Sequence, residues 1–422
     1  MIKILDYSYL GDKIFQREIS SNNAYETVKE ILEKVKSEGD KALYFYSEKF
    51  DGAKLSSLEV SSTEIEEAFS MVEPEFIRIL NDAAKNIREF HSNQVRDGFK
   101  IKKKNGVVVG QKITPIERVG LYVPGGTAAY PSTVLMDSIP AKIAGVKELY
   151  ITTPPNKEGK INPVILAAAR VAGVDKIYKV GGAQAIAALA LGTETIKKVD
   201  KIVGPGNTFV AEAKRQVFGM VSIDMIAGPS EILVIADGKS NPRHVAIDLL
   251  SQAEHDKNAS AVLVTDSYAL AKSVQEEIEI EIKKLNRSDI ARASIENNGK
   301  IIVAKDIEEV IKVSNEIAPE HLELMVDEPF KYLEKITNAG SIFMGRFCPE
   351  ALGDYYAGPN HTLPTSGTAR FSSPLSVDDF IKKTQFTYYT KEALEKVYKD
   401  VAYFAEKEGL NAHRDSVKSR FE

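Results

Sequence analysis

The sequence predicts an α/β protein built from two parallel, doubly wound sheets. From about Val119 onward, short apolar segments alternate with amphipathic helical segments. The apolar segments are continuous rather than alternating, which is typical of strands buried on both faces of a parallel sheet. This alternation occurs in two series, and a chain of 422 residues is longer than one ordinary core accommodates. We therefore expect two α/β domains with a cleft between them.

Each series supplies its own strands and helices. The first series predicts strands at residues 119–123, 148–152, 176–180 and 201–203, with helices at 132–144, 163–171, 183–191 and 208–218. The second series predicts strands at residues 232–236, 261–265, 300–303, 322–326 and 341–343, with helices at 242–255, 268–285, 307–317 and 329–337. Helices that separate consecutive apolar strands are the crossovers that parallel strands require.

The segments outside the two series have a different character. Residues 1–22 are weakly periodic and are expected to form an arm that ends at a helix-start signal, Ser20 to Asn23. Helical patterns follow at residues 24–35, 42–50 and 73–95, and Asn105-Gly106 predicts a hairpin turn. The early helices are expected to pack on one of the sheets. Residues 348–374, rich in Gly, Pro, Ser and Thr, predict a functional or linking loop before a helix at 391–408.

The composition excludes several classes of protein. A net charge of -5 argues against nucleic-acid binding and against a charged membrane surface. No segment approaches the length of apolar residues that a membrane span needs, and the start of the chain lacks a signal-peptide pattern. Cys348 is the one cysteine, so a disulfide within the chain and a cysteine-based zinc site are both excluded, and a cytoplasmic location is expected.

Three glycine-rich stretches follow predicted strands of the first series. They begin at Gly125, Gly181 and Gly204, and each precedes a helix. In open α/β folds this carboxyl edge of the sheet is where ligands bind, and glycine lets backbone N–H groups approach a phosphate. Any one stretch could equally be a tight turn. Neither G-x-G-x-x-G nor a P-loop occurs, so the usual dinucleotide and triphosphate fingerprints are missing.

Four of the six histidines lie in polar company. Gln252 and His255 are three residues apart and share a helix face, where they could hold a metal, cap a turn or lie on the surface. His361 follows Asp354 in the loop after the second series, and His413 lies near the C-terminus. Zinc without cysteine is held by histidine and carboxylate, so His255, His413, Asp354 and the amide oxygen of Gln252 are candidate ligands, although a lone histidine is more often structural.

Glu320 and His321 are adjacent at the entry to a predicted strand. An imidazole titrates near neutrality and a carboxylate can activate water, so the pair suits general acid–base catalysis. The alternative is an exposed pair at a helix-terminal turn. Zincin-type proteolysis is disfavoured because H-E-x-x-H is absent.

Several stretches together resemble the histidinol dehydrogenase family. They are residues 223–234 (IDMIAGPSEILV), 180–190 (VGGAQAIAALA), 203–207 (VGPGN), 248–255 (DLLSQAEH), 319–321 (PEH), 353–355 (GDY) and 358–361 (GPNH). The resemblance runs from about residue 20 to the C-terminus. It implies the zinc-dependent oxidation of L-histidinol to L-histidine through bound L-histidinaldehyde with two NAD+, the final steps of histidine biosynthesis.

The resemblance also implies roles for individual residues. Glu320 and His321 are the implied catalytic residues. The implied zinc ligands are Gln252, His255, Asp354 and His413, with one zinc per subunit. The implied substrate contacts are Ser230, Gln252, His255, His321, Asp354, His361, Glu408 and His413. The implied NAD+ contacts are Tyr122, Gln184 and Asn207, one on each glycine-rich stretch.

The resemblance further implies two incomplete Rossmann-like domains in a domain-swapped homodimer with shared sites. We expect an N-terminal arm (1–22), a helical part packing on the second α/β domain (23–115), a first α/β domain on the NAD side (116–229), a second on the zinc and acid–base side (230–347), and a C-terminal loop and helical tail reaching the partner subunit (348–422). The alternative function is a zinc-dependent hydrolase in which Glu320 activates water.

Overall fold

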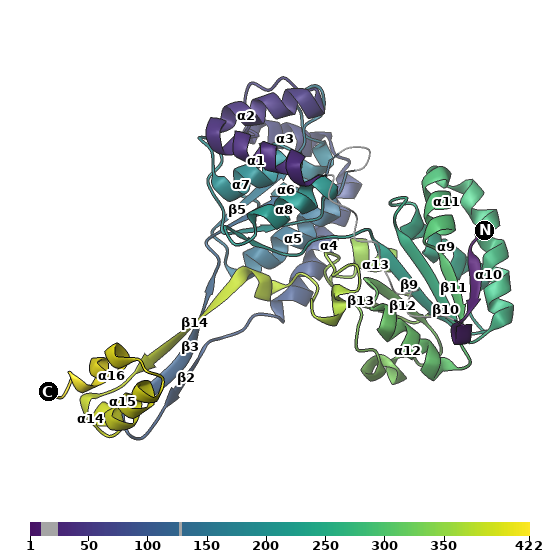
Figure 1. Ribbon diagram of the computed structural model, residues 1–422. Coiled ribbons are helices and arrows are strands. Elements are labelled where there is room, and N and C mark those ends of the chain that lie inside the picture. Colours follow the sequence, from purple (N-terminus) through teal and green to yellow (C-terminus); the bar gives the residue numbers. More distant parts are fainter. Residues whose placement is uncertain (10–23, 126–128) are drawn as a thin grey trace. The chain divides into compact units, whose positions relative to one another are not determined.

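The computed structural model describes residues 1–9, 24–125 and 129–422, which divide into two units (Figure 1). The first unit contains the described residues of Met1–Gln94 and Ile116–Phe380. The second unit contains Val95–Pro115 and Ile381–Glu422.

One sheet of the first unit has five parallel strands in the order β6-β5-β4-β7-β8. The strands are β4 (Arg118–Tyr122), β5 (Glu148–Thr153), β6 (Lys176–Lys179), β7 (Lys201–Val203) and β8 (Ser222–Ile223). The intervening helices are α5 (Pro131–Ala144), α6 (Pro163–Ala172), α7 (Gly182–Leu191) and α8 (Thr208–Val217). The order reverses between β4 and β7, so the predicted doubly wound sheet is confirmed and its switch point lies between these strands.

Apolar side chains cover both faces of this sheet. Val119 and Leu121 of β4 belong to one buried cluster, while Tyr122 belongs to the other. Helix α7 packs closely on β4 because Gly120 has no side chain: a Cβ there would lie 2.7 Å from a Leu189 methyl group. Glycine at this position therefore sets the distance between helix and strand.

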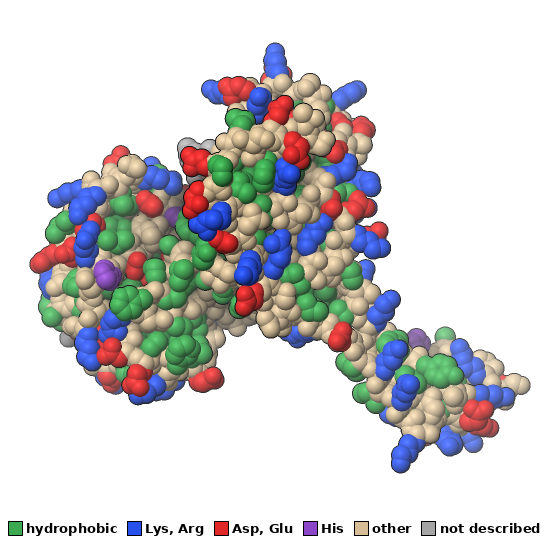
Figure 2. Space-filling model, turned by 180° about the vertical axis from the view of Figure 1, so that it is seen from behind, with side chains coloured by type: hydrophobic (Ala, Val, Ile, Leu, Met, Phe, Trp, Pro, Cys, Tyr) green, Lys and Arg blue, Asp and Glu red, His purple; other side chains and the backbone are tan. Residues whose placement is uncertain are grey.

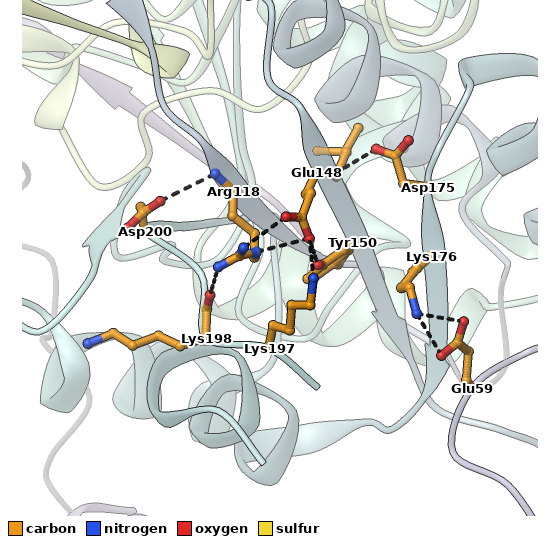
Figure 3. A network of polar contacts seen from close by, with 10 residues as sticks. Glu59, Arg118, Glu148, Tyr150, Asp175, Lys176, Lys197, Lys198 and Asp200 are labelled. Carbon is orange, nitrogen blue, oxygen red and sulfur yellow. Dashed lines mark hydrogen bonds and ion pairs between the residues drawn. The ribbon is translucent and has the colours of Figure 1, made fainter. Parts of the chain in front are cut away.

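A polar network closes the amino edge of the same sheet (Figure 3). The Arg118 guanidinium donates two hydrogen bonds to Glu148 on the neighbouring strand, at 3.2 and 2.8 Å, and a third to the Lys198 carbonyl at 2.9 Å. The Leu149 N–H donates to Asp175 at 2.8 Å. These bonds fix the register of the strands at the amino edge of the sheet. The three glycine-rich stretches lie at the opposite, carboxyl edge, which this network does not occupy.

The second sheet has six parallel strands in the order β1-β11-β10-β9-β12-β13. They are β1 (Lys3–Asp6), β9 (Glu231–Ala236), β10 (Ser260–Thr265), β11 (Lys300–Val303), β12 (His321–Met325) and β13 (Ser341–Met344). Its helices are α9 (Pro242–Ala253), α10 (Tyr268–Glu281), α11 (Ser288–Asn297) and α12 (Ile307–Ile317). Buried clusters on both faces confirm the second doubly wound sheet. The predicted helix at 329–337 is two short 3-10 turns, η5 (Pro329–Lys331) and η6 (Leu333–Lys335).

The beginning of the chain differs from the predicted arm. Lys3–Asp6 is the edge strand β1, parallel to β11, and Ile2 is buried in the core of the second sheet. A four-residue strand is too short to show periodicity, so its pairing with a strand about 300 residues away is not visible in the sequence. The predicted arm beyond Tyr9 lies outside the described residues.

The early helices pack on the first sheet's helices, not on the second α/β domain as predicted. They are α1 (Tyr25–Glu38), α2 (Asp40–Tyr46), the π-helical turn η3 (Ser47–Asp51), α3 (Ser62–Met71) and α4 (Pro74–Ser92). Helix α1 contacts α7 and α8, α3 contacts α6, and α4 contacts α5. Val28, Ile31 and Val35 of α1 share a buried cluster with α7. The apolar stripe of each helix predicts that one face of the helix is buried, but it does not predict which sheet that face packs toward.

The segment after β13 is partly helical. Helix α13 (Glu350–Tyr355) begins within the predicted loop, which then continues through the turns η7 (Thr368–Arg370) and η8 (Val377–Phe380). The six residues of α13 are too few for a periodic pattern to appear in the sequence. This helix carries Glu350 and Asp354, which lie close to His321.

The second unit is built on a three-stranded antiparallel sheet. Strand β3 (Val108–Pro115) lies between β2 (Phe99–Lys102) and β14 (Ile381–Tyr388). The predicted Asn105-Gly106 hairpin joins β2 to β3, with Lys103 N–H donating to the Val107 carbonyl at 2.8 Å. The predicted helix at 391–408 is two helices, α14 (Lys391–Glu395) and α15 (Tyr398–Lys407), followed by α16 (Asn411–Lys418).

The surface agrees with the charge of the chain. Figure 2 shows Lys and Arg mixed with Asp and Glu over the visible face of each unit. None of the helices in the described ranges has the length and hydropathy of a membrane span.

Candidate active site

Tyr122 and Gln184 lie together at the carboxyl edge of the first sheet. The Tyr122 hydroxyl, at the end of β4, accepts a hydrogen bond from the Gly182 N–H at 3.2 Å. Gly182 begins α7, which carries Gln184 two residues later. The Gln184 side chain is buried, and its Oε1 has no hydrogen-bond partner among the described residues. A buried acceptor without a donor is expected where a ligand supplies the donor.

Asn207 lies at the carboxyl end of β7, on the other side of the switch point. Its side-chain oxygen caps α8 by accepting from the N–H groups of Phe209 and Val210, at 3.0 and 3.1 Å. The oxygen therefore has a structural role in helix capping, while the exposed amide nitrogen is the group Asn207 can offer to a ligand. The predicted residues on three stretches thus lie on one edge of one sheet.

A buried ion pair holds the loop that precedes Asn207. Lys214 of α8 pairs with Asp224, and its Nζ also donates to the Gly204 carbonyl at 2.9 Å. Asp224 in turn accepts from the Gly204 N–H at 2.7 Å. Both side chains are almost fully buried. The loop is therefore fixed from beneath by a charge pair that is costly to break.

Glu320 and His321 lie at the amino edge of the second sheet, where β12 begins beside β9. Both are buried, which excludes the exposed helix-terminal turn considered as their alternative. This edge is opposite to the one at which open α/β sheets usually bind ligands. The candidate site forms at this edge because the end of α9 and the segment around α13 bring the remaining polar groups to it.

The hydrogen bonds of His321 define its tautomer. Its Nδ1 lies 3.0 Å from the Glu231 carbonyl oxygen, which can only accept, so Nδ1 carries the proton. In the neutral ring Nε2 is then the basic nitrogen, and it faces Glu350 Oε1 at 3.7 Å and Asp354 Oδ1 at 3.8 Å. Burial lowers the pKa of His321 to about 3. The imidazole is therefore neutral near pH 7 and can accept a proton at Nε2.

The Glu320 carboxyl group is held by the neighbouring strand. Its Oε2 accepts from the Glu231 N–H at 2.8 Å and lies 3.7 Å from His321 Nδ1. Burial raises the pKa of Glu320 well above its ordinary range. A carboxyl group with a raised pKa next to a neutral imidazole is an arrangement suited to acid–base work on water.

His321, Glu350 and Asp354 form a group that could hold a metal ion. One potential ligand atom from each lies within 4.8 Å of the others. Burial raises the pKa of Asp354 to about 7 and that of Glu350 well above its ordinary range. A divalent cation would compensate these two carboxylates, and histidine with carboxylate is a donor set suited to zinc.

Gln252 lies against the same group, on the last turn of α9. Its amide is satisfied when its nitrogen faces Glu350: Nε2 then donates to Glu350 Oε1 at 3.0 Å. The amide oxygen then lies 3.2 Å from His321 Nδ1 and 3.3 Å from the Glu231 nitrogen. Glu350 Oε2 is buried and has no hydrogen-bond partner among the described residues. Two carboxylates and an imidazole, with one carboxylate oxygen buried and without a partner among the described residues, therefore fit a bound cation.

His361 connects this group to the first sheet. Its Nδ1 lies 4.0 Å from Asp354 Oδ1, and its Nε2 lies 3.3 Å from the Thr133 hydroxyl of α5. Burial lowers the pKa of His361 to about 4. The neighbouring residues are also bound to α5: the Asn360 amide donates to the Met136 carbonyl at 2.6 Å, and the Thr362 hydroxyl donates to Asp137 at 2.8 Å.

The remaining predicted site residues are located by their neighbours in the chain or by a groove that they line. His255 follows α9 and is close enough that its charge contributes to the lowered pKa values of His321 and His361. Ser230 immediately precedes β9, next to Glu231. Glu408 and His413 belong to the second unit, where they line a groove of about 760 Å³ between α15 and α16. The structure therefore groups Glu320, His321, Gln252, Asp354 and His361 within the first unit.

Glu350 is the site residue that the sequence analysis missed. Glu350 begins α13, four residues before Asp354, so the two side chains share a helix face. That spacing was the available signal. It was hidden because the surrounding glycine- and proline-rich composition predicts a loop rather than a helix.

Comparison with known proteins shows the family of this chain. A family model described as histidinol dehydrogenase matches residues 15–421. A histidinol dehydrogenase of Clostridium acetobutylicum is 56% identical over 423 residues, covering 99% of this chain and 98% of the relative. The chain belongs to the histidinol dehydrogenase family. A family member from Listeria monocytogenes is 55% identical over 408 residues, covering 96% of this chain and 95% of the relative.

A solved structure agrees as well. The crystal structure of histidinol dehydrogenase from Elizabethkingia anophelis superimposes with a TM-score of 0.94 at 43% sequence identity, covering 99% of this chain and 97% of that chain. The resemblance found in the sequence is thus confirmed, and with it the oxidoreductase class.

Proposed function

We propose that this chain oxidises L-histidinol to L-histidine through bound L-histidinaldehyde, with two NAD+ per turnover and one zinc ion per subunit. The observation that carries the proposal is the buried pair Glu320–His321, whose free Nε2 faces two carboxylates in a member of this family. A hydrolase would also use a metal and Glu320, but the family membership favours the dehydrogenase.

The proposed zinc ligands and the proposed NAD+ contacts form two separate groups of residues. Zinc would be held by Gln252, His255, Asp354 and His413 of the partner subunit, and NAD+ would lie on Tyr122, Gln184 and Asn207. When bound, zinc would supply a Lewis acid that orients the substrate's nitrogen atoms, and NAD+ would supply the hydride acceptor. Ser230, His361 and Glu408 would complete the substrate site.

In the first oxidation His321 is the base. Its Nδ1–H bond to the Glu231 carbonyl holds the ring, and Nε2 accepts the proton of the substrate hydroxyl. Because burial disfavours the charged ring, the imidazolium formed in this step returns its proton readily. The carboxylates beside Nε2 stabilise that charge while it exists.

In the second oxidation Glu320 acts on water. Its carboxyl group is fixed by the Glu231 N–H, and its raised pKa favours acceptance of a proton from a water molecule that adds to the aldehyde. The resulting hydrate has a hydroxyl group from which His321 can again accept a proton. One pair of residues thus serves both oxidations without the substrate leaving.

A coupled assay tests the proposal. NADH absorbance should rise when L-histidinol is added with NAD+, should be lost in chelator, and should return with zinc. Two NADH per histidinol consumed are expected. Production of NADH that is unaffected by metal removal would contradict the metal, and no NADH at all would contradict the dehydrogenase.

We further propose a domain-swapped homodimer, located in the cytoplasm, in which the second unit completes the partner's site. His255→Ala and His413→Ala chains, each inactive alone, should regain one active site of two when mixed and re-dimerised. That site combines an intact His255 from one chain with an intact His413 from the other. Absence of any recovery in a confirmed heterodimer would contradict the shared site.

A further inference from the structure

The first sheet lacks the acidic residue with which dinucleotide-binding folds usually hold a ribose. In those folds an Asp or Glu at the end of the β-α-β unit accepts a hydrogen bond from the 2′-hydroxyl of the adenosine ribose. Here the corresponding unit is β4-α5-β5, because β5 lies beside β4 on the side away from the switch point. Strand β5 ends at Thr153 and continues into residues 154–156 (PPN), none of which is acidic. An acidic acceptor for a ribose at this edge would have to come from another part of the chain.

Asp51 is a carboxylate from outside the sheet that lies beside this strand end. It ends the π-helical turn η3, which continues from α2, and α2 contacts α7. The next residue, Gly52, lies against the loop that follows β5, since a Cβ on Gly52 would lie 3.7 Å from Cγ of Lys157. Burial raises the pKa of Tyr122, and the nearby charge of Asp51 raises it further. Asp51 therefore lies close to Tyr122, one of the proposed NAD+ contacts.

The Asp51 carboxylate has no partner among the described residues. Its Oδ2 is buried without a hydrogen bond, although the residue as a whole is partly exposed, and burial raises its pKa to about 6. A carboxylate that loses water without gaining a donor is costly. Gln184 Oε1 is a second buried acceptor without a partner, and it lies near Gly182, whose N–H donates to the Tyr122 hydroxyl. Two acceptors without donors near one tyrosine indicate a ligand that presents donors to this edge.

We propose that Asp51 accepts a hydrogen bond from the 2′-hydroxyl of the adenosine ribose of NAD+ and thereby selects NAD+ over NADP+. The 2′-phosphate of NADP+ would bring negative charge to a partly buried carboxylate, where water screens the repulsion less than at the surface. Lys157 in the adjoining loop is exposed, so water screens its charge and it offsets the repulsion only weakly. The inference rests on the proposed NAD+ site and adds to it a residue that determines which dinucleotide binds.

Steady-state kinetics with altered cofactors tests this contact on the full-length protein. The variants are Asp51→Ala and Asp51→Asn, which keeps the shape of the side chain. Each is assayed at saturating L-histidinol in the presence of zinc with NAD+, with the NAD+ analogue that lacks the adenosine 2′-hydroxyl, and with NADP+. Glu48→Gln is the matched control, because it removes an exposed carboxylate from the same turn, where Glu48 pairs with Lys54 at 3.3 Å. Thermal denaturation checks that each variant folds.

The wild type should lose about tenfold or more in kcat/KM when the cofactor lacks the 2′-hydroxyl, because a hydrogen bond to a charged acceptor is lost. In Asp51→Ala the same change of cofactor should cost less than about twofold, since the acceptor is gone. Asp51→Ala should also raise the KM for NAD+ about tenfold while kcat stays within about twofold, because the contact lies away from the reacting atoms.

The preference for NAD+ over NADP+ should narrow by about tenfold or more in Asp51→Ala, because the repelling charge is removed. Asp51→Asn retains a neutral acceptor, so it should show a smaller change in the same direction, and it carries the test if Asp51→Ala does not fold. Glu48→Gln should match the wild type in each of these ratios.

Two results overturn the inference. Equal losses on removal of the 2′-hydroxyl in the wild type and in the folded Asp51 variants would show that Asp51 does not contact that hydroxyl. An unchanged preference between NAD+ and NADP+ in those variants would show that the charge of Asp51 does not select the cofactor. If the wild type reduces neither dinucleotide, the proposed function fails first and this inference with it.

Discussion

Asp137 gives the stability of this protein a specific pH dependence. Its side chain lies on α5 and is fully buried. Its Oδ1 accepts from the Thr362 hydroxyl at 2.8 Å, whereas Oδ2 has no hydrogen-bond partner among the described residues. Burial raises the pKa of Asp137 from 3.8 to about 7, and the Thr362 hydrogen bond only partly offsets it. Folding therefore favours the protonated acid.

The linkage between proton binding and folding gives the sign and the size of this effect on stability. Because the pKa of Asp137 is higher in the folded chain than in the unfolded one, its contribution to stability is complete below pH 3.8 and is lost as the pH rises through about 7. At about 1.4 kcal/mol per pH unit, the loss between these limits is about 4 kcal/mol. Asp137→Asn is neutral at every pH and keeps an oxygen that accepts from Thr362, so it removes this loss.

The assay is thermal denaturation of wild type and Asp137→Asn from pH 4 to pH 8. The variant should gain in Tm relative to the wild type as the pH rises, by several degrees at pH 8 and by little near pH 4. Asp266→Asn, an exposed aspartate between β10 and α10, controls for a general effect of removing one carboxylate. A difference in Tm between Asp137→Asn and wild type that is the same at pH 5 and pH 8 would refute the reasoning.

Three further predictions concern the buried ion pair, the loop of His361 and the binding of NAD+. Lys214→Met leaves Asp224 buried without its partner and should cost about 3–5 kcal/mol in urea denaturation; a cost below about 1 kcal/mol would contradict the buried pair. Thr362→Val frees the loop of His361 from Asp137 and should raise the KM for histidinol several-fold without changing the KM for NAD+, while Thr362→Ser restores it. Because no dinucleotide fingerprint is present, the NAD+ dissociation constant should be weaker than about 1 µM, about -8.2 kcal/mol, by calorimetry.

The sequence predicted the strands and crossovers well because each buried parallel strand is marked locally by a continuous apolar run. What it did not predict is pairing between distant segments. Lys3–Asp6 becomes an edge strand only beside β11, and β14 becomes a strand only because β3 presents an unpaired edge to it. The partner sheet of helices α1 to α4 is likewise decided by shape complementarity, which an apolar stripe does not encode.

The candidate site likewise has a part that the sequence predicts and a part that depends on contacts between distant residues. Glu320 and His321 stand in a recognisable motif, and the structure supplies what the motif cannot: the Glu231 backbone, which bonds both side chains and so fixes the tautomer of His321 and the position of Glu320. Glu350 carries no motif of its own, and it joins the site because α9 brings the Gln252 amide within 3.0 Å of it. A candidate ligand can be predicted from residue type and spacing, whereas a residue such as Glu350 joins the site only through contacts that the fold creates.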